Sequence, residues 1–203
     1  MISGRGSNFE AIARAVSEGK IPARIVAVIS NRPDAAGLAT ARRTGLNAIS
    51  VASKGRPRGE FESELLAVLQ ASGADMICLA GFMRLLTPHF VRSFPGRILN
   101  IHPSLLPAFP GVDAQQQALE HGVKFTGCTV HLVDEGVDSG PIILQAVVPV
   151  LDGDTVESLS ARILEQEHRI YPEAVKLAAE GRIEVSGRRV LLKSEAAKRN
   201  EQA

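Results

Sequence analysis

The stretch Arg97-Ile-Leu-Asn-Ile-His-Pro-Ser-Leu-Leu-Pro107 is typical of a buried strand that ends in a proline-bounded loop. Residues 97–102 predict the strand, and Pro103 ends it because proline has no N–H to donate to a ladder. Asn100 and His102 interrupt an otherwise apolar run, and they share one face because strand side chains repeat every two residues. His102 is therefore expected at the carboxyl end of a strand, where α/β sheets bind ligands.

Short β-rich runs alternate with longer stretches of helical period on both sides of this strand. The predicted helices are 8–20, with Asn8 as its cap, 34–43, 60–71 and 154–180, the last broken near Pro172. The predicted strands are 24–30, 47–52, 75–80, 97–102, 126–133 and 142–150, and 182–192 predicts a closing hairpin. We therefore expect an α/β fold of Rossmann-like type, with a doubly wound, mostly parallel sheet, antiparallel additions toward the C-terminus and helices on both faces.

The 203 residues, 45% of them hydrophobic, are enough for one core but not for two full domains. A single domain is expected over 1–192, followed by a charged tail at 193–203 that lacks periodic apolar positions and should fray. One feature departs from an open α/β domain, which normally starts with a full buried strand. Only Met1 and Ile2 precede Ser3, so either the sequence begins late or the sheet lacks most of its first strand.

Composition excludes several classes of partner. The net charge is +1, with 23 basic and 22 acidic residues, so no global field favours nucleic acid or an anionic membrane. Cys78 and Cys128 lie in apolar stretches without metal-type spacing and are expected to be reduced core thiols. No apolar run reaches the roughly 20 residues that span a bilayer, and the start has no signal-peptide core. We therefore expect a cytoplasmic protein without membrane or nucleic-acid partners.

Three segments could carry chemistry. Glycines in the turn 3–8 let backbone N–H groups approach a phosphate at a helix N-terminus, although such a turn is more often only a turn. The pair Asn100 and His102 offers an amide beside a titratable ring, but it could equally well satisfy the groups of its own loop. The connection 134–140 contains several acids, and a carboxylate near His102 would favour the imidazolium. Acidic glycine loops are, however, usually solvated turns.

Two other polar residues, His131 and Ser104, lie near these segments in the sequence. His131 lies in a predicted strand, where a core or supporting histidine is the expected role. Ser104 follows the histidine by two positions, but the sequence has no G-x-S-x-G elbow and Ser104 lies in a proline-bounded loop. A serine hydrolase is therefore not expected.

The three segments, in this order, resemble the folate-dependent formyltransferase family from Ile2 to about Ile183. The densest similarity covers 74–110, ADMICLAGFMRLLTPHFVRSFPGRILNIHPSLLPAFP. A departure from the commonest pattern is Ala108, where many relatives carry Lys. The resemblance implies that Asn100, His102 and Asp138 are catalytic.

The resemblance also implies the binding positions. The ribonucleotide and its phosphate would be held by Gly6, Ser7, Asn8 and Glu167. Folate would be held by Arg58, Met83, Arg84, Leu85, Leu86, Asn100 and the loop of Asp134, Glu135, Gly136, Val137 and Asp138.

The implied reaction moves a formyl group from 10-formyltetrahydrofolate, as co-substrate, to the amine of glycinamide ribonucleotide, in purine biosynthesis and one-carbon metabolism. No metal is implied. The alternatives are formyltetrahydrofolate hydrolase, which has an additional amino-terminal domain, and a non-catalytic folate or nucleotide-binding module. Methionyl-tRNA formyltransferase carries a basic carboxy-terminal domain for which the tail after Leu192 is too short. The sequence leaves open whether the protein is a monomer or homodimer, whether 134–140 moves, and whether Pro107 follows a cis bond.

Overall fold

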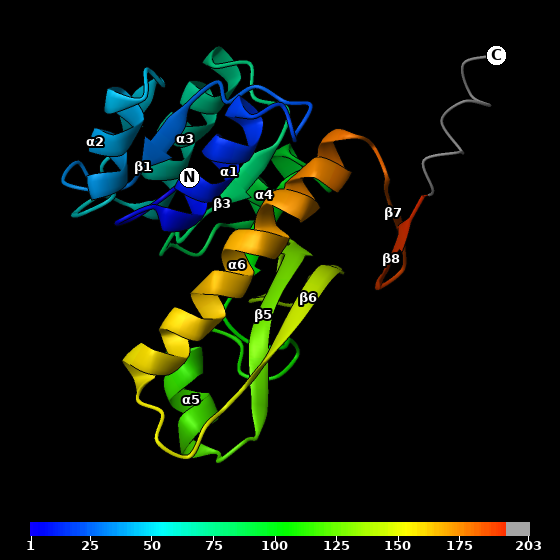
Figure 1. The fold of residues 1–203 in the computed structure, drawn as a ribbon. Helices are drawn as coiled ribbons and strands as arrows, with labels where there is room; N and C mark the ends of the chain where they lie inside the picture. The colour runs from blue at the N-terminus through cyan, green and yellow to red at the C-terminus, as the bar shows by residue number, and fades with distance from the viewer. Residues whose placement is uncertain (194–203) are drawn as a thin grey trace.

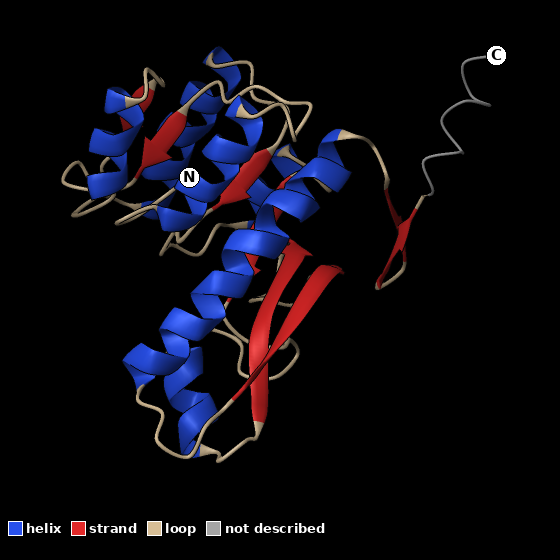
Figure 2. Ribbon diagram, in the orientation of Figure 1, coloured by secondary structure: helices blue, strands red, loops and turns tan. Residues whose placement is uncertain are grey.

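The alternating apolar runs and amphipathic segments form a mixed sheet with helices on both faces in the computed structural model, which describes residues 1–193 (Figures 1 and 2). The helices are α1 (Ser7–Ser17), α2 (Ala36–Arg43), α3 (Arg58–Ala71), α4 (Pro88–Ser93), α5 (Ala114–Glu120) and α6 (Val156–Ala179). The strands are β1 (Val28–Ser30), β2 (Ala48–Ser50), β3 (Ile77–Leu79), β4 (Ile98–His102), β5 (Phe125–Leu132), β6 (Ile142–Pro149), β7 (Ile183–Ser186) and β8 (Arg189–Leu192).

Strand pairing is parallel up to β4 and antiparallel from β4 to β6, and β8 then pairs with β6 in parallel. β1 pairs with β2 and β3 with β4 in parallel, whereas β4 to β5 and β5 to β6 are antiparallel. β1 and β2 form a two-stranded sheet, and the other strands form a six-stranded sheet in the order β3-β4-β5-β6-β8-β7. The hairpin β7–β8 joins β6 through the pair Ile142 and Arg189. The predicted α/β class, the antiparallel additions and the closing hairpin are therefore confirmed.

A short segment, Met1–Ser3, connects the two-stranded and the six-stranded sheet. The N–H of Ile2 donates to the carbonyl of Ile29 (2.9 Å), and the carbonyl of Met1 accepts from the N–H of Ala80 (2.8 Å). Ile2 also forms a parallel bridge with Ser30. The segment thus occupies a strand position between β1 and β3.

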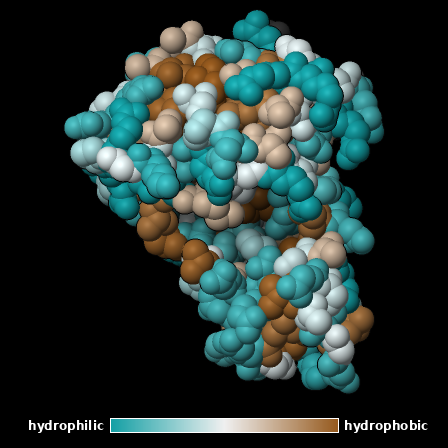
Figure 3. All heavy atoms as spheres, turned by 90° about the vertical axis from the view of Figure 1, so that its left-hand side faces the viewer, coloured by the Kyte–Doolittle hydropathy of each residue, from teal (hydrophilic) through white to brown (hydrophobic). Residues whose placement is uncertain are grey.

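Two apolar clusters lie on opposite faces of the sheet. One contains buried residues of α1, α2 and α6, and Leu99 and Ile101 of β4 belong to it. The other contains buried residues of α3 and α4, together with Ile98. Figure 1 shows α6 running the length of the molecule, past β5 and β6. Figure 3 shows a hollow in the surface between the upper and lower parts of the molecule. Figure 1 places α5 and the lower ends of β5 and β6 in the lower part.

Some expected boundaries are wrong. The strand expected at 24–30 is limited to Val28–Ser30, because Met1–Ser3 offers a partner only along that part. The strand expected at 75–80 is likewise shorter and covers Ile77–Leu79. Asn8 does not cap α1, since the N-cap is Gly6 in a left-handed conformation (φ 82°) and Asn8 lies within the first turn. The short helices α4 and α5 were not expected.

Helix α6 is continuous across Pro172, contrary to the expected break. Proline removes one helical hydrogen bond and costs about 3 kcal/mol in a helix interior. Burial of its neighbours offsets this cost: Ile170 and Tyr171 are buried, and the Tyr171 hydroxyl lies 3.0 Å from the carbonyl oxygens of Leu79 and Leu99. Tertiary packing therefore overrides the local preference.

The single-domain boundary at 1–192 stays a prediction, and the tail expected at 193–203 lies outside the described residues beyond Lys193. Across residues 1–193, no helix is both long and apolar enough to cross a membrane.

Candidate active site

The site begins at the carboxyl end of β4. Ile98 points into the cluster beneath α3 and α4, so the period of two places Asn100 and His102 on the same face, as predicted. In the antiparallel register with β5, Asn100 lies opposite His131 and His102 opposite Thr129. The ladder therefore brings a second histidine to the pair.

Both ring nitrogens of His102 face oxygen acceptors. Nε2 lies 2.8 Å from the carbonyl of Phe109, and Nδ1 lies 3.3 Å from Oδ2 of Asp138. The side chain is almost fully buried, with 5% of its surface exposed. A neutral imidazole has one donor and one acceptor, whereas the imidazolium has two donors. The carboxylate that the sequence led us to expect near His102 is therefore present, and it lies at Nδ1 of the ring.

Asp138 is held by groups from three segments. Its Oδ2 accepts from the N–H of Gly111 (2.8 Å), and its Oδ1 lies 3.6 Å from Nε2 of His131. Burial alone would raise the pKa of Asp138, but the contact with His131, the Gly111 N–H and the charge of His102 outweigh it and lower that pKa. Asp138 therefore remains a carboxylate at neutral pH.

Asn100 is fixed by His131 and Asp138. Its Nδ2 lies 3.2 Å from Nε2 of His131 and 3.4 Å from Oδ1 of Asp138. Nδ1 of His131 lies 2.9 Å from the carbonyl of Leu132, so this ring is held at both of its nitrogens.

Three non-glycine residues within 1–193 have positive φ: Phe109 (φ 52°), Asp113 (φ 56°) and Asp138 (φ 50°). Left-handed backbone at such residues is uncommon, is held by the surrounding structure and is typical of functional sites. Two of the three residues contact His102 directly. The bond between Leu106 and Pro107, which the sequence left open, is cis.

A second group of expected residues forms around the glycine turn. Gly6 precedes α1, and Ser7 and Asn8 are its first residues. Nδ2 of Asn8 donates to Oε2 of Glu167 on α6 (2.7 Å), so the turn and Glu167 lie together. Oδ1 of Asn8 is buried and has no hydrogen-bond partner within residues 1–193. Burial raises the pKa of Glu167, although the bond from Asn8 opposes the rise.

A cavity of about 970 Å³ extends from the glycine turn to Met83 and Arg84. The N–H of Met83 donates to Oγ of Ser3 (2.8 Å), which fixes this segment against the turn. Basic side chains of Arg5, Arg32, Lys54 and Arg84 also line the cavity. Asn100, His102 and Asp138 are not among its lining residues, so the two groups of predicted site residues are not joined by this cavity.

The remaining positions expected at the folate site are mostly exposed. Met83 is 74% and Leu85 58% exposed, and Val137 is 49% exposed. Arg58 is the first residue of α3 and is also exposed, and Leu86 packs against the cluster beneath α3 and α4.

The expected acidic loop is folded on its own side chains. Oδ1 of Asp134 accepts from the N–H of Gly136 (3.1 Å) and from Oγ of Ser139 (2.7 Å). Glu135 pairs with Arg92 of α4 (2.6 Å). These bonds hold the loop that carries Asp138.

Sequence reasoning missed several supporting groups. His131 was expected to be a core or supporting residue, but its direct bond to Asn100 depends on the β4–β5 register. The Gly111 N–H and the Phe109 carbonyl are backbone groups, which no side-chain pattern reveals. Glu62 of α3 accepts from the N–H of Thr87 (2.9 Å) and from its hydroxyl, and so anchors the end of the segment Met83–Leu86.

Comparison with known proteins places this geometry in a family. A family model described as formyl transferase matches residues 1–175. The phosphoribosylglycinamide formyltransferase of Escherichia coli (strain K12) is 45% identical over 186 residues, covering 91% of this chain and 88% of that protein. The glycinamide ribonucleotide transformylase 1 of Symbiobacterium toebii has a solved structure that is 59% identical, with a TM-score of 0.93, covering 95% of this chain and 92% of that one.

A longer relative is similar over the same region. The trifunctional purine biosynthetic protein adenosine-3 of Gallus gallus is 48% identical over 186 residues, which are 91% of this chain and 18% of that protein. The chain thus spans less than a fifth of the length of this relative. The matched region includes the strand end that carries Asn100 and His102 and the loop that carries Asp138, and the chain belongs to the formyl transferase family.

Proposed function

We propose that this chain transfers a formyl group from 10-formyltetrahydrofolate to the amine of glycinamide ribonucleotide, the reaction of a phosphoribosylglycinamide formyltransferase. The observation that carries the proposal is the buried ring of His102, which has an oxygen acceptor at each nitrogen and lies on the same strand face as Asn100. This arrangement suits a reaction in which negative charge develops on an oxygen atom. Formyl transfer is such a reaction.

In this mechanism the substrate amine attacks the formyl carbon. A new C–N bond forms, and the carbonyl electron pair moves to the formyl oxygen. Charged His102 and the Asn100 amide stabilise that oxyanion, a contribution typically worth about 100-fold or more in rate. Because both ring nitrogens of His102 already have acceptors, the formyl oxygen replaces one of them; exchange of the Phe109 carbonyl leaves the Asp138 contact intact.

Collapse of the tetrahedral intermediate breaks the bond between the formyl carbon and the folate nitrogen. The amine must lose a proton, and the leaving nitrogen must gain one. Asp138 keeps His102 charged and can pass this proton through a water molecule. Its lowered pKa supports the ionised form at neutral pH. Every step uses the residues described above, and we propose no metal.

The glycine turn is proposed to receive the ribonucleotide phosphate. Gly6 adopts φ 82°, and the first N–H groups of α1 lack partners within the helix, so they can donate to an anion at the positive end of the dipole. The buried Oδ1 of Asn8 and the carboxyl of Glu167 are acceptors for the N–H groups of the glycinamide. These contacts favour the ribonucleotide over water as the acceptor of the formyl group.

The folate is proposed to contact the exposed apolar side chains of Met83, Leu85 and Val137. Asp134, Glu135 and Gly136 lie in the same loop as Val137 and would surround the pterin with backbone groups. Arg84 lies 5.9 Å from the centre of the Phe61 ring, and with Arg58 it could meet the carboxylates of the folate tail. The partners that we propose are thus small molecules.

The proposal is tested by supplying the purified protein with a 10-formylfolate, with and without glycinamide ribonucleotide. We expect deformylated folate and the formylated ribonucleotide in equal amounts, and only when the ribonucleotide is present. Release of formate without the ribonucleotide would indicate the hydrolase. Binding without turnover in either mixture would indicate a binding module.

A further inference from the structure

Glu62 of α3 is a buried acid that takes no part in the proposed mechanism. Only 3% of its surface is exposed, and a buried carboxyl group is costly unless it is hydrogen-bonded. Both of its oxygens have a partner, and both bonds come from one residue, Thr87. The side chain of Glu62 is therefore directed at the point where the segment 83–86 ends and α4 begins.

Thr87 is held by its backbone and by its side chain. Its N–H donates to Oε1 of Glu62 (2.9 Å), and its hydroxyl donates to Oε2. The same hydroxyl oxygen accepts from the N–H of Phe90 (3.3 Å) as the N-cap of α4. Glu62 therefore fixes the end of the segment 83–86 and the start of α4 together.

The residue before Glu62 contacts the same segment. Phe61 is buried, and the guanidinium of Arg84 lies 5.9 Å from the centre of its ring. Leu86 packs against the apolar cluster to which Phe61 belongs. Consecutive residues of α3 thus hold the segment at Arg84 and at Thr87.

The side chains that we propose for folate binding depend on this support. Met83 and Leu85 are 74% and 58% exposed, so few contacts of their own fix their positions. The backbone that carries them is bonded at its two ends, by the Met83 N–H to Oγ of Ser3 (2.8 Å) and by Thr87 to Glu62. Where these two apolar side chains lie therefore depends on the bonds at the ends.

Helix α4 links the same anchor to the acidic loop. Arg92, in its last turn, pairs with Glu135 of the loop 134–138 (2.6 Å). Both side chains are more than half exposed, at 64% and 52%, and exposed pairs are weak by themselves. The loop is therefore aligned with the segment 83–86 only while α4 is held at its start.

We propose that Glu62 is a positioning residue of the folate site, which acts through Thr87 on the segment 83–86 and through α4 on the loop 134–138. The proposal rests on the proposed function, because it concerns how that reaction binds its folate. Glu62 itself contacts no reacting atom in this account.

The reacting groups have supports of their own. His102 is held by the carbonyl of Phe109 and by Asp138, and Asp138 also accepts from the N–H of Gly111. None of these bonds involves Glu62. Loss of Glu62 should therefore weaken folate binding more than it slows the chemical step.

The test compares three variants with the parent chain. Glu62→Ala removes both acceptors, whereas Glu62→Gln keeps an acceptor for the Thr87 N–H and offers a donor to its hydroxyl oxygen. The matched control is Glu64→Ala, an exposed acid of the same helix that pairs with Arg56. Steady-state kinetics give kcat and the separate KM values for 10-formyltetrahydrofolate and for glycinamide ribonucleotide.

We expect Glu62→Ala to raise the folate KM by about tenfold or more, with kcat and the ribonucleotide KM within about threefold of the parent. Glu62→Gln should recover most of the loss, and Glu64→Ala should match the parent. Equal rises in both KM values, or a fall in kcat as large as the rise in folate KM, would mean a general loss of structure and overturn the proposal. If Glu62→Ala does not fold, Thr87→Val, which removes only the hydroxyl bond, should raise the folate KM by about threefold or more, and an unchanged value would overturn the proposal.

A second measurement needs no substrate. Amide hydrogen exchange at Thr87, followed by NMR, should speed up by about tenfold or more in Glu62→Ala, whereas Ile77, whose N–H bonds to Arg97 (2.8 Å), serves as an unaffected internal control. Unchanged exchange at Thr87, or an unchanged folate KM in an active variant, counts against Glu62 alone. Absence of formyl transfer by the parent chain counts against the proposed function, so the two failures are distinguishable.

Discussion

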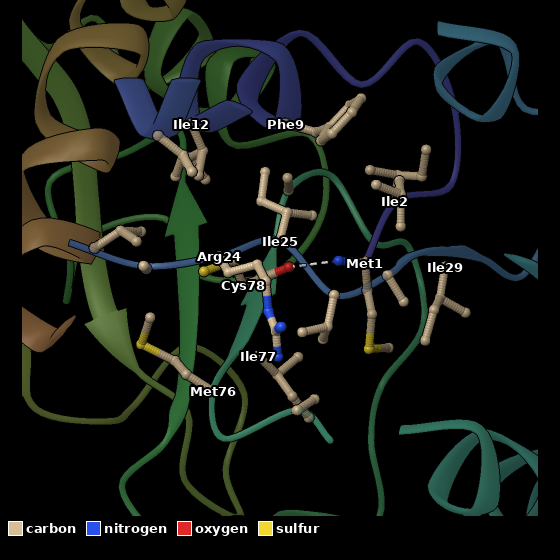
Figure 4. Close-up of a pocket in the computed structure, with 18 of the residues that line it drawn as sticks. Met1, Ile2, Phe9, Ile12, Arg24, Ile25, Ile29, Met76, Ile77 and Cys78 are labelled. Carbon is tan, nitrogen blue, oxygen red and sulfur yellow. Dashed lines mark hydrogen bonds between the residues drawn. The ribbon is translucent and has the colours of Figure 1, made fainter. Parts of the chain in front are cut away.

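The two ends of the sheet differ in how completely their polar groups are paired. At the carboxyl ends, β4 has a partner on both sides, and His102, Asn100 and Asp138 bond to one another and to nearby backbone. At the amino ends, β1 and β3 are separated by an apolar cavity (Figure 4) and share only the Met1–Ser3 segment. The groups that we propose to react are therefore held at the end of a strand that is paired on both edges, which favours fixed side-chain positions.

The sharpest way to test this contrast is to remove a group at the paired end. His102→Ala should lower kcat by about 100-fold or more with little change in KM, because the charge on the oxyanion loses its partner. Asp138→Asn should act in the same direction. Steady-state kinetics of both variants provide the measurement.

His89 is an exposed residue on the surface of α4, so His89→Ala is the matched control and should keep full activity. If KM rose as much as kcat fell in His102→Ala, the residue would bind substrate without a special role in the transition state.

The contrast also predicts unequal costs of core truncation. Leu99→Ala, at a fully buried position of β4, should lower the free energy of unfolding by about 3 kcal/mol through lost burial and a new cavity. Ile25→Ala should cost less than about 1 kcal/mol, because Ile25 is half-buried and already borders empty space. Denaturant unfolding measures both. Equal costs would mean that the two ends are equally well packed.

The pH dependence of the free energy of unfolding reports on the buried Met1 amino group. The folded pKa of the Met1 amino group is about 6 and its unfolded value about 8, so between these pH values the unfolded chain binds more protons. Stability should therefore rise by about 2 kcal/mol from pH 6 to pH 8 on account of this group.

Acetylation of the amino group supplies the control, because it removes the ionisable group and leaves the histidines unchanged. Unfolding free energies at pH 6 and pH 8 are measured for both forms. If the acetylated chain shows the same rise as the free chain, the ammonium is not buried as described.

The smallest expected effect concerns the link between the two ends. The Tyr171 hydroxyl lies 3.0 Å from the carbonyl oxygens of Leu79 on β3 and Leu99 on β4. Tyr171→Phe removes this buried hydrogen bond and should cost about 1 kcal/mol, or about 2 to 4 °C in Tm.

Ser93→Ala removes an exposed hydroxyl and should leave Tm unchanged by comparison. Differential scanning calorimetry distinguishes the two variants. An unchanged Tm in Tyr171→Phe would show that the contacts of the hydroxyl with β3 and β4 do not stabilise the fold.

Part of the site follows from local rules. The period of two put Asn100 and His102 on one face, and Pro103 fixed the end of the strand. The closing hairpin and the antiparallel additions also followed from local patterns. Two predictions from the sequence were wrong: the full strand at 24–30 and the helix break at Pro172. Both features depend on residues distant in the chain, since a neighbouring strand sets the length of β1 and the packing of Tyr171 keeps α6 continuous.

The α/β class and the placement of an amide and an imidazole on one strand face could be predicted from sequence, since both depend on residues a few positions apart. The folded structure was needed to show that His131 contacts Asn100, that Gly111 and Phe109 contribute backbone groups, and that Asn8 bonds to Glu167 across 159 positions of chain. Such contacts depend on register and packing between distant segments, and a local pattern carries no information about them.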